Sequence, residues 1–296
     1  MPKALNFEYL ACSIIDPFPS SCCNGPRLWF CCNCLFTHFV WVGARCNCSP
    51  CDFEQSRALG IMRNKNIKVA DWGSLSYGEA WQRQEEYFAQ VIAQKKKNRQ
   101  LEEPLPTDNY FFWVEHPPVF TLGKSGKMEH LLLQEKEIKA QGISFFKTNR
   151  GGDITFHGPG QIVGYPILDL DNFFTDIHKY LRCLEEVIIK TLADYGLDGA
   201  RSDGETGVWL DLGTPFARKI CAMGVRASRW VTMHGFAFNV NTDMSYFDYI
   251  VPCGIQGKGV TSLAQELKKQ VAEQEVKVKL LHHFTEIFES ECQLIS

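Results

Sequence analysis

The sequence has no uninterrupted apolar run long enough to span a membrane. Its most apolar stretch, residues 28–44, is interrupted by polar side chains, and a spanning helix needs about 20 apolar residues. Basic residues are not in excess, because 31 Lys and Arg stand against 34 Asp and Glu, for a net charge of −3. That balance excludes a polybasic nucleic-acid binder, and a hydrophobic content of 45% excludes a disordered chain. A folded protein that binds neither membrane nor nucleic acid is expected.

Several common catalytic motifs are also missing. Gly123-Lys124-Ser125 resembles the end of a phosphate-binding loop, but Pro118 occupies the position where that loop needs glycine. The sequence contains neither the G-x-S-x-G turn of serine hydrolases nor the H-E-x-x-H helix of zinc peptidases. These three reaction classes therefore have no support.

Cysteine is abundant, but only in one region. Nine of the 13 cysteines lie in the first 51 residues. Cys31 and Cys34 form one C-x-x-C pair and Cys48 and Cys51 form another, 13 residues apart, which approaches the spacing of a zinc ribbon. The alternative, which we expect, is that residues 1–61 lie outside the folded unit, as a disordered segment or a mis-assigned start with Met62 as the true one. Nothing else in the chain indicates secretion, so we expect a cytoplasmic protein.

From residue 62 to residue 296 the hydrophobic pattern indicates one α+β domain. Long helices are predicted from apolar residues at helical spacing, and Ser76-x-x-Glu79 is a capping box that begins the first of them. The helices are expected after Ser76 and at residues 131–141, 173–195 and 273–289. Strands are expected at residues 68–72, 110–115, 119–122, 144–147, 207–211, 220–225 and 235–240. Strands in hairpin-like pairs mixed with a few long helices favour α+β over a repeated βαβ pattern.

Residues 150–161, RGGDITFHGPGQ, are unusually rich in glycine. Four glycines in twelve residues let the backbone approach a ligand closely, while Arg150 and His157 supply a cation and a ring that can carry a proton. A glycine-rich turn with a hydrogen-bonded histidine is an equally good interpretation of this stretch alone.

Two further residues suggest proton transfer and nucleophilic attack. Lys219 interrupts an apolar strand, where partial desolvation would bring an amine toward proton transfer near neutral pH; a lysine at a strand edge that reaches water is the alternative. Cys253 stands between Pro252 and Gly254, on a bend that would expose a thiol to substrate. A lone cysteine is more often an apolar filler, so Cys253 needs the other motifs to support it.

Together these stretches resemble the lipoyl(octanoyl) transferase family of lipoate biosynthesis, in its bacterial form. RGGDITFHGPGQ, KICAMG (219–224), HGFAFN (234–239), PCG (252–254) and VTSL (260–263) follow the order and approximate spacing of that family. The likeness runs from about residue 68 to the C-terminus and leaves the first sixty residues without a counterpart. It implies a fold like that of biotin and lipoate protein ligases, with a mixed sheet flanked by helices.

The resemblance also implies a reaction. Cys253 would attack the thioester of octanoyl-acyl carrier protein to form an acyl-enzyme, with Lys219 as acid and base. A lysine of a lipoyl domain would then take the acyl group as an amide, which is the first step of endogenous protein lipoylation. The acceptors would be the E2 subunits of 2-oxoacid dehydrogenase complexes and the glycine cleavage H protein. Because both steps start from a thioester, no cofactor and no metal are expected. The enzyme is also expected to act as a monomer.

The same resemblance places the acyl pocket on three stretches of the chain. They are Arg150, Gly151, Gly152, Asp153, Ile154, Thr155, Phe156 and His157, then Ala222, Met223 and Gly224, then Gly235, Phe236 and Ala237. Arg218, Arg226, Arg229 and Lys258 either form a basic rim that attracts acidic partners or are ordinary scattered surface charge.

Four other functions stay open at this point. An ATP-dependent lipoate or octanoate ligase and an amidotransferase between lipoyl domains would share the fold. A non-catalytic zinc-binding interaction protein would use the cysteine-rich segment. A cysteine hydrolase would pair Cys253 with His234, and would leave Lys219 unexplained.

Overall fold

The structure is a computed structural model and describes residues 63–251 and 259–295. Within them, nine strands form one mixed β-sheet in the order β12-β1-β2-β6-β10-β9-β8-β7, with β11 beside β9. β1 is parallel to both of its neighbours and β11 is parallel to β9, whereas the other pairs are antiparallel. The strands are β1 (Asn66–Ser74), β2 (Asn109–Glu115), β6 (Gln161–Ile167), β7 (Ala200–Arg201), β8 (Val208–Leu210), β9 (Arg218–Ser228), β10 (Val231–Asn239), β11 (Gly259–Val260) and β12 (Glu291–Leu294).

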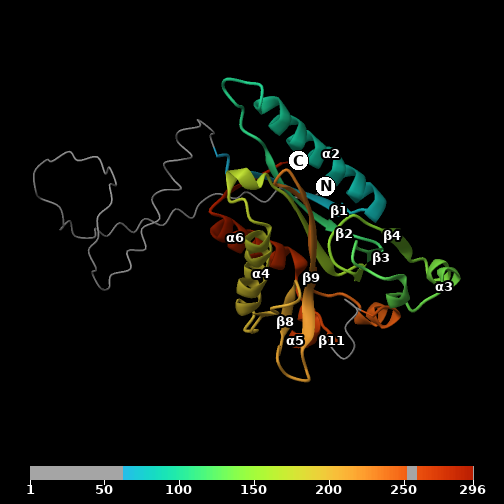
Figure 1. The fold of residues 1–296 in the computed structure, drawn as a ribbon. Helices are drawn as coiled ribbons and strands as arrows, with labels where there is room; N and C mark the ends of the chain where they lie inside the picture. Colours follow the sequence, from blue (N-terminus) through green and yellow to red (C-terminus); the bar gives the residue numbers. More distant parts are fainter. Residues whose placement is uncertain (1–62, 252–258, 296) are drawn as a thin grey trace, which may run out of the picture. The chain divides into compact units, whose positions relative to one another are not determined.

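Helices cover both faces of this sheet (Figure 1). α2 (Tyr77–Asn98) packs on one face, and α4 (Ile177–Ala193) and α6 (Glu273–Phe288) pack on the other. The alternation of β2 explains both layers, because Phe112 faces α2 while Phe111 contacts the ring of Phe284 in α6. The expected α+β class, a mixed sheet flanked by helices, is confirmed.

A second sheet carries the glycine-rich stretch. It contains β4 (Ser144–Lys147), β3 (Val119–Leu122) and β5 (Ile154–His157), and it is covered by α3 (Glu135–Ala140) and the 3-10 helix η3 (Met244–Tyr249). The remaining elements are the 3-10 helices η1 (Met128–His130) and η2 (Leu170–Asn172) and the short helix α5 (Leu263–Leu267).

Two sequence predictions about the starts of helices were wrong. Residues 131–134 are not helical, because Leu131 forms a β-bridge with Ile250 and α3 begins only at Glu135. α4 begins at Ile177 rather than at residue 173, because the Asp176 side chain caps it by accepting from the Lys179 amide. β2 and β3 follow each other in the chain but belong to different sheets.

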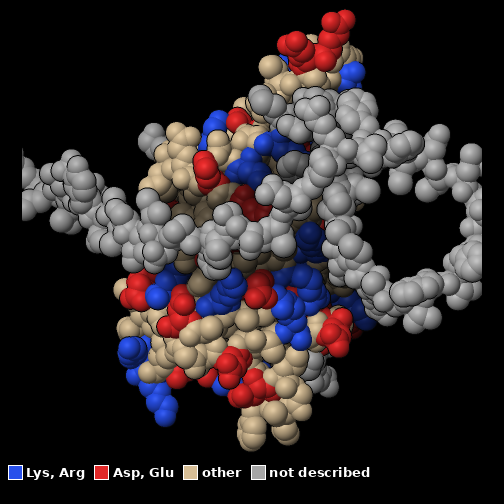
Figure 2. Space-filling model, turned by 90° about the vertical axis from the view of Figure 1, so that its left-hand side faces the viewer, with Lys and Arg blue, Asp and Glu red and all other residues tan. Residues whose placement is uncertain are grey.

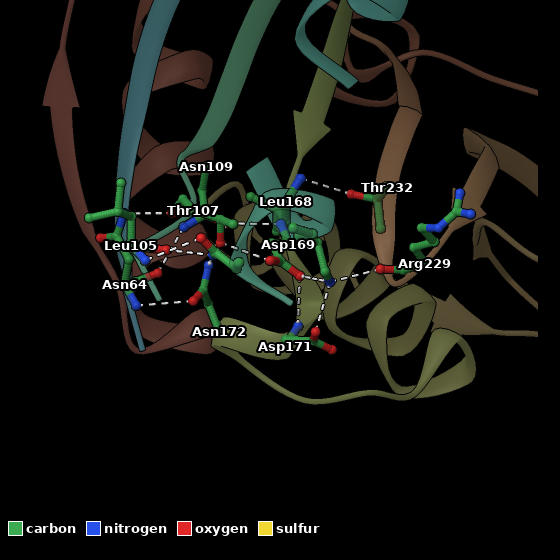
Figure 3. Close-up of polar contacts among 12 residues, drawn as sticks. Asn64, Leu105, Thr107, Asn109, Leu168, Asp169, Asp171, Asn172, Arg229 and Thr232 are labelled. Carbon is green, nitrogen blue, oxygen red and sulfur yellow. Dashed lines mark hydrogen bonds and ion pairs between the residues drawn. The ribbon is translucent and has the colours of Figure 1, made fainter. Parts of the chain in front are cut away.

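A buried polar network joins five elements at one end of the large sheet (Figure 3). Its centre is Asp169, whose side chain is ion-paired with Lys95 of α2 and accepts a hydrogen bond from Thr107 Oγ1 at 2.8 Å. The Asp169 amide donates to Asn109 Oδ1 at 3.0 Å, and Lys95 also donates to the carbonyl of Arg229. The network holds the ends of α2, β2, β6 and β10 and the start of η2 together.

The face on which α4 and α6 lie carries both signs of charge. Figure 2 shows Lys and Arg interspersed with Asp and Glu on it. Across the two helices, Lys190 lies 3.7 Å from Glu286, and His283 lies 2.9 Å from Asp194. No helix in the described ranges has both the length and the apolar character that crossing a membrane requires.

Candidate active site

A cavity of about 620 Å³ opens where β9 meets the glycine-rich stretch. Every pocket residue expected from the sequence lines it except Phe156. Phe156 instead stacks on Tyr246 in the core of the small sheet, with ring centroids 4.5 Å apart. The structure thus brings the three separate sequence stretches to one cavity.

The glycines of the stretch are explained by close backbone packing. Residues 151 and 152 lie between the backbones of Gly123 and Gly224, and the Gly151 amide donates to the Val225 carbonyl at 2.9 Å. A methyl group on Gly123 would lie 2.2 Å from the Gly152 carbonyl oxygen, and one on Gly224 would lie 2.6 Å from that of Gly151. Gly152 itself has φ of +85°, a conformation that favours glycine. Side chains at these positions would force the loop out of the cavity wall.

Arg150 holds this loop in place. Its guanidinium donates to the carbonyls of Gly151, Thr121 and Asp153 at 2.7–2.9 Å, and also to the Thr121 hydroxyl. The side chain is buried, so a ligand would meet a cation that already serves several backbone oxygens. Besides the expected role as a cation for the ligand, Arg150 therefore has a structural role in holding the loop.

His157 belongs to a chain of buried polar side chains. Its Nδ1 lies 2.8 Å from Gln161 Oε1 and its Nε2 lies 3.2 Å from the Thr121 hydroxyl. Gln161 donates to Asn239 Oδ1, and Asn239 donates to the Thr261 carbonyl. Burial holds the pKa of His157 well below its usual value, and the nearby His116 and Arg150 lower it further. His157 is thus a neutral, fixed ring rather than a mobile proton carrier.

Lys219 of β9 points into the cavity, as expected for a lysine within an apolar strand. Its side chain is 6% exposed, its Nζ donates to the Thr206 carbonyl at 3.3 Å, and the ammonium lies 4.6 Å from the centre of the Trp209 ring. Its backbone is fixed on the other side, where Lys219 pairs with Val260 of β11 and accepts from the Thr261 amide. The VTSL stretch therefore lies against the strand that carries the lysine.

Cys253 lies outside the described residues, as do Pro252, Gly254 and Lys258. The described chain reaches Val251, whose amide donates to the His130 carbonyl at 2.7 Å, and resumes at Gly259 in β11. Among the described cysteines, Cys221 is buried in the core, and burial holds the pKa of its thiol well above the usual value. Burial likewise raises the pKa of Cys183, and that of Cys292 to about 11. These three thiols are protonated near neutral pH.

The cavity also has walls that sequence reasoning did not assign to a site. Ile177 and Leu181 of α4, Tyr77 of α2 and Tyr165 of β6 all line it. The helical spacing placed the α4 and α2 residues on apolar faces, but apolar spacing does not tell a core position from the wall of a cavity.

Two arginines of the expected basic rim, Arg218 and Arg226 of β9, do not form a free positive surface. Arg218 donates to Glu266 through Nε and Nη2 at 2.7 and 2.6 Å and is also paired with Asp211. Arg226 Nη1 lies 2.6 Å from Glu85. Neighbouring carboxylates therefore neutralise both charges locally, while Arg229 is exposed.

One cluster of metal-ligand type occurs in the described ranges, away from the cavity. His282, His283 and Glu286 of α6 have ligand atoms within 4.8 Å of one another. His283 already contacts Asp194, so hydrogen bonding within the protein explains this surface cluster.

Three histidines, His116, His157 and His234, are buried in their neutral form, so we expect the fold to be sensitive to acid. Burial lowers the pKa of His116 to about 4 and that of His234 to about 3, whereas an unfolded histidine titrates near 6.5. The unfolded state therefore binds more protons below about pH 6.5, and stability is lost as the pH falls from there. We expect a loss on the order of 1 kcal/mol per histidine for each pH unit below that value.

Urea unfolding from about pH 7 to about pH 5 checks this expectation. His116→Gln removes one group that takes up a proton on unfolding, so its unfolding free energy should fall less steeply with decreasing pH, by up to about 1 kcal/mol per pH unit. His178→Gln, at an exposed position of α4, should leave the slope unchanged. Equal slopes in the two variants would contradict the prediction.

Comparison with known proteins agrees with this geometry. Residues 76–285 match the family described as the lipoyl protein ligase A/B catalytic domain. A protein of Flavobacterium johnsoniae named octanoyltransferase is 66% identical over 229 residues, which cover 77% of this chain and 99% of that protein. One of Bacteroides thetaiotaomicron with the same name is 50% identical, over 72% and 91% of the two chains.

A solved structure shows the same fold at low sequence identity. The bipartite lipoate protein ligase of Thermoplasma acidophilum superimposes with a TM-score of 0.57 at 15% identity, over 79% of this chain and 88% of that one. The expected likeness to lipoate protein ligases in fold is confirmed. On the strength of the matched domain and of its relatives, this chain belongs to the lipoyl protein ligase A/B catalytic domain family and, within it, to the octanoyltransferases.

Proposed function

We propose that this protein transfers an octanoyl group from octanoyl-acyl carrier protein to a lysine of lipoyl domains. The acceptors are the E2 subunits of 2-oxoacid dehydrogenase complexes and the glycine cleavage H protein. The observation that carries the proposal is a buried lysine in the wall of a cavity lined by both apolar and polar residues. The chain is also 66% identical to a protein named octanoyltransferase. A cavity of this volume is within the range of small-ligand sites.

The proposed mechanism has two acyl transfers. The Cys253 thiolate attacks the thioester carbonyl carbon, the carbon–sulfur bond to the carrier breaks, and the leaving thiolate takes a proton from the Lys219 ammonium. The acceptor amine then attacks the acyl-enzyme, its proton passes to Lys219, and the carbon–sulfur bond to Cys253 breaks. The short sequence separation supports this pairing, because Val260, seven residues after Cys253, lies opposite Lys219 in the β11–β9 register.

The acyl chain would lie in the cavity beside β9 and β10. Ala222, Gly224, Gly235 and Ala237 leave room for it, and Met223 with Phe236 supplies apolar surface. The glycine-rich loop lines the same cavity, so its backbone amides are candidates to stabilise the developing oxyanion, except that of Gly151, which already donates to Val225.

Mass spectrometry after mixing the protein with octanoyl-acyl carrier protein tests the proposal. We expect one octanoyl adduct, mapped by peptide digestion to Cys253, which disappears when a lipoyl domain is added. Cys221→Ala is the matched control and should give the same adduct, because the thiol of Cys221 is buried and protonated. An adduct on another cysteine, or transfer without any adduct, would contradict the mechanism.

The same assay separates the two alternatives of similar fold. A ligase would transfer free octanoate only with ATP and Mg²⁺, and an amidotransferase would accept octanoyl-lipoyl domain as its donor. Our proposal predicts transfer from the carrier thioester without nucleotide.

The proposal assigns transfer to residues 62–296 and gives residues 1–61, which lie outside the described residues, no part in it. It places the reaction in the cytoplasm, with the enzyme acting as a monomer. Retention of full activity after removal of residues 1–61 is the corresponding expectation.

A further inference from the structure

A carboxylate is completely buried behind the lysine. Glu185 lies on the inward face of α4, its exposed fraction is 0%, and it does not line the cavity. Burying a charge is costly unless partners compensate it, so its contacts indicate what the position is for.

Glu185 has partners on three sides. Its Oε1 accepts a hydrogen bond from the Gly207 amide at 3.0 Å, and its Oε2 lies 2.9 Å from Arg182 Nη1 and 3.4 Å from Arg201 Nε. Burial raises the pKa of the carboxyl above its usual value, although the Gly207 amide, Arg182, Arg201 and Lys219 all oppose that shift. The two arginines are partly exposed and pair with the carboxylate from its outer side, whereas Gly207 connects it to the cavity.

One peptide unit joins this carboxylate to the lysine. The Gly207 N–H donates to Glu185, and the carbonyl of the same peptide, that of Thr206, accepts from Lys219 Nζ at 3.3 Å. A peptide held between an anion at its N–H and a cation at its C=O is polarised in the direction that strengthens both bonds. The negative charge of Glu185 therefore acts on the ammonium through the peptide.

The position of that peptide is sterically fixed. Gly207 has φ of +125°, and a methyl group on it would lie 2.6 Å from the Cys221 carbonyl oxygen and 3.4 Å from Lys219 Cε. Only glycine lets the peptide lie this close to β9, beside the aliphatic part of the lysine.

From these contacts we infer that Glu185 is a positioning residue for Lys219, which it holds in place and in its charged form through the Thr206–Gly207 peptide. The inference rests on the proposed role of Lys219 as proton donor and acceptor. A purely structural role, as an anchor for Arg182 and Arg201 only, is the competing explanation.

The neighbouring glutamate on α4 provides a matched control. Glu185→Gln keeps the side-chain length and an oxygen for the Gly207 amide but removes the charge. Glu186→Gln removes a charge that also pairs with Arg201 and that contacts neither Gly207 nor Lys219 in the described contacts. Acyl-enzyme formation is followed in a rapid-quench experiment, where the burst amplitude counts correctly folded sites and the rate is expressed per site.

We expect the rate per site in Glu185→Gln to be about tenfold or more below that in Glu186→Gln, part of the 10²–10⁴-fold that acid–base catalysis supplies. The KM for octanoyl-acyl carrier protein should be unchanged, because Glu185 does not line the cavity. The limb of the pH–rate profile that reports Lys219 should move to lower pH, because a positive charge is less favourable without the carboxylate. The other charged or titratable groups around Glu185 and on the cavity wall beside Thr206, namely Arg182, Arg201, Cys221 and Glu205, are the same in both variants.

A second variant keeps the test decisive if Glu185→Gln does not fold. Glu185→Asp keeps the charge but shortens the side chain by one methylene, so it should lower the rate per site while leaving the profile in place. Two results would overturn the inference alone, provided that the wild type forms the adduct. One is a rate per site in the Glu185 variants within twofold of that in Glu186→Gln. The other is a pH–rate profile of Glu185→Gln that matches that of the wild type. Absence of an adduct in the wild type would overturn the proposed function and the inference with it.

Discussion

Replacing Lys219 by methionine is expected to slow octanoyl transfer by about 10²–10⁴-fold, the usual contribution of a positioned acid–base group. Methionine fills the same narrow space beside Trp209 and Gly207 but carries no proton. Because the replaced ammonium is buried at the cavity wall, the loss should appear in the rate of acyl-enzyme formation and the protein should remain folded. Rapid-quench measurement of that rate, together with urea unfolding, checks both parts.

A second lysine provides the control for this substitution. Lys179 lies over the Phe174 ring at 4.6 Å, the distance that also separates Lys219 from Trp209, but it is exposed and does not line the cavity. Lys179→Met should transfer octanoyl groups at the wild-type rate. A Lys219→Met enzyme within about threefold of Lys179→Met would contradict the acid–base role.

Replacing Asp169 by alanine is expected to lower the free energy of unfolding by about 3–5 kcal/mol, the usual result of removing one partner of a buried ion pair. Asp169 is 2% exposed, and the substitution leaves the Lys95 ammonium and the Thr107 hydroxyl without this acceptor. The ends of α2, β2 and β6 would lose their common partner (Figure 3). Urea unfolding at neutral pH measures the change.

Asp171 tests whether burial, rather than contact with Lys95, sets that cost. It also pairs with Lys95, at 2.8 Å, but its side chain is 45% exposed. Asp171→Ala should cost only about 0–1 kcal/mol, as exposed ion pairs do. Similar losses in the two variants would show that the buried network does not carry the stability we assign to it.

The sequence predicted elements whose signals are local and missed those that depend on distant partners. The spacing of apolar residues predicted α2 and α6, and Ser76 caps α2 as expected. β12 has no counterpart among the predicted strands, because it pairs with β1, more than 200 residues earlier. A contact of that separation leaves no trace in local periodicity.

The site shows the same limit in chemical terms. The family resemblance linked Lys219 to the glycine-rich stretch, whereas each motif alone had left a bland alternative open. The motifs gave no sign that Arg150 serves backbone carbonyls or that Glu185 reaches the Gly207 amide, because both depend on how separate elements pack. A charged residue within an otherwise apolar helical face was the available signal for Glu185.

The pairing of β1 with β12 has a consequence for how the protein is made. Asn66 lies opposite Glu291, so this part of the sheet cannot close until residue 291 has left the ribosome. Until then, one edge of β1 exposes unpaired backbone groups, which other chains can join. Because contacts between distant residues also form slowly, the growing chain is exposed to aggregation at this edge until β12 has been made, and chaperone binding there would protect it.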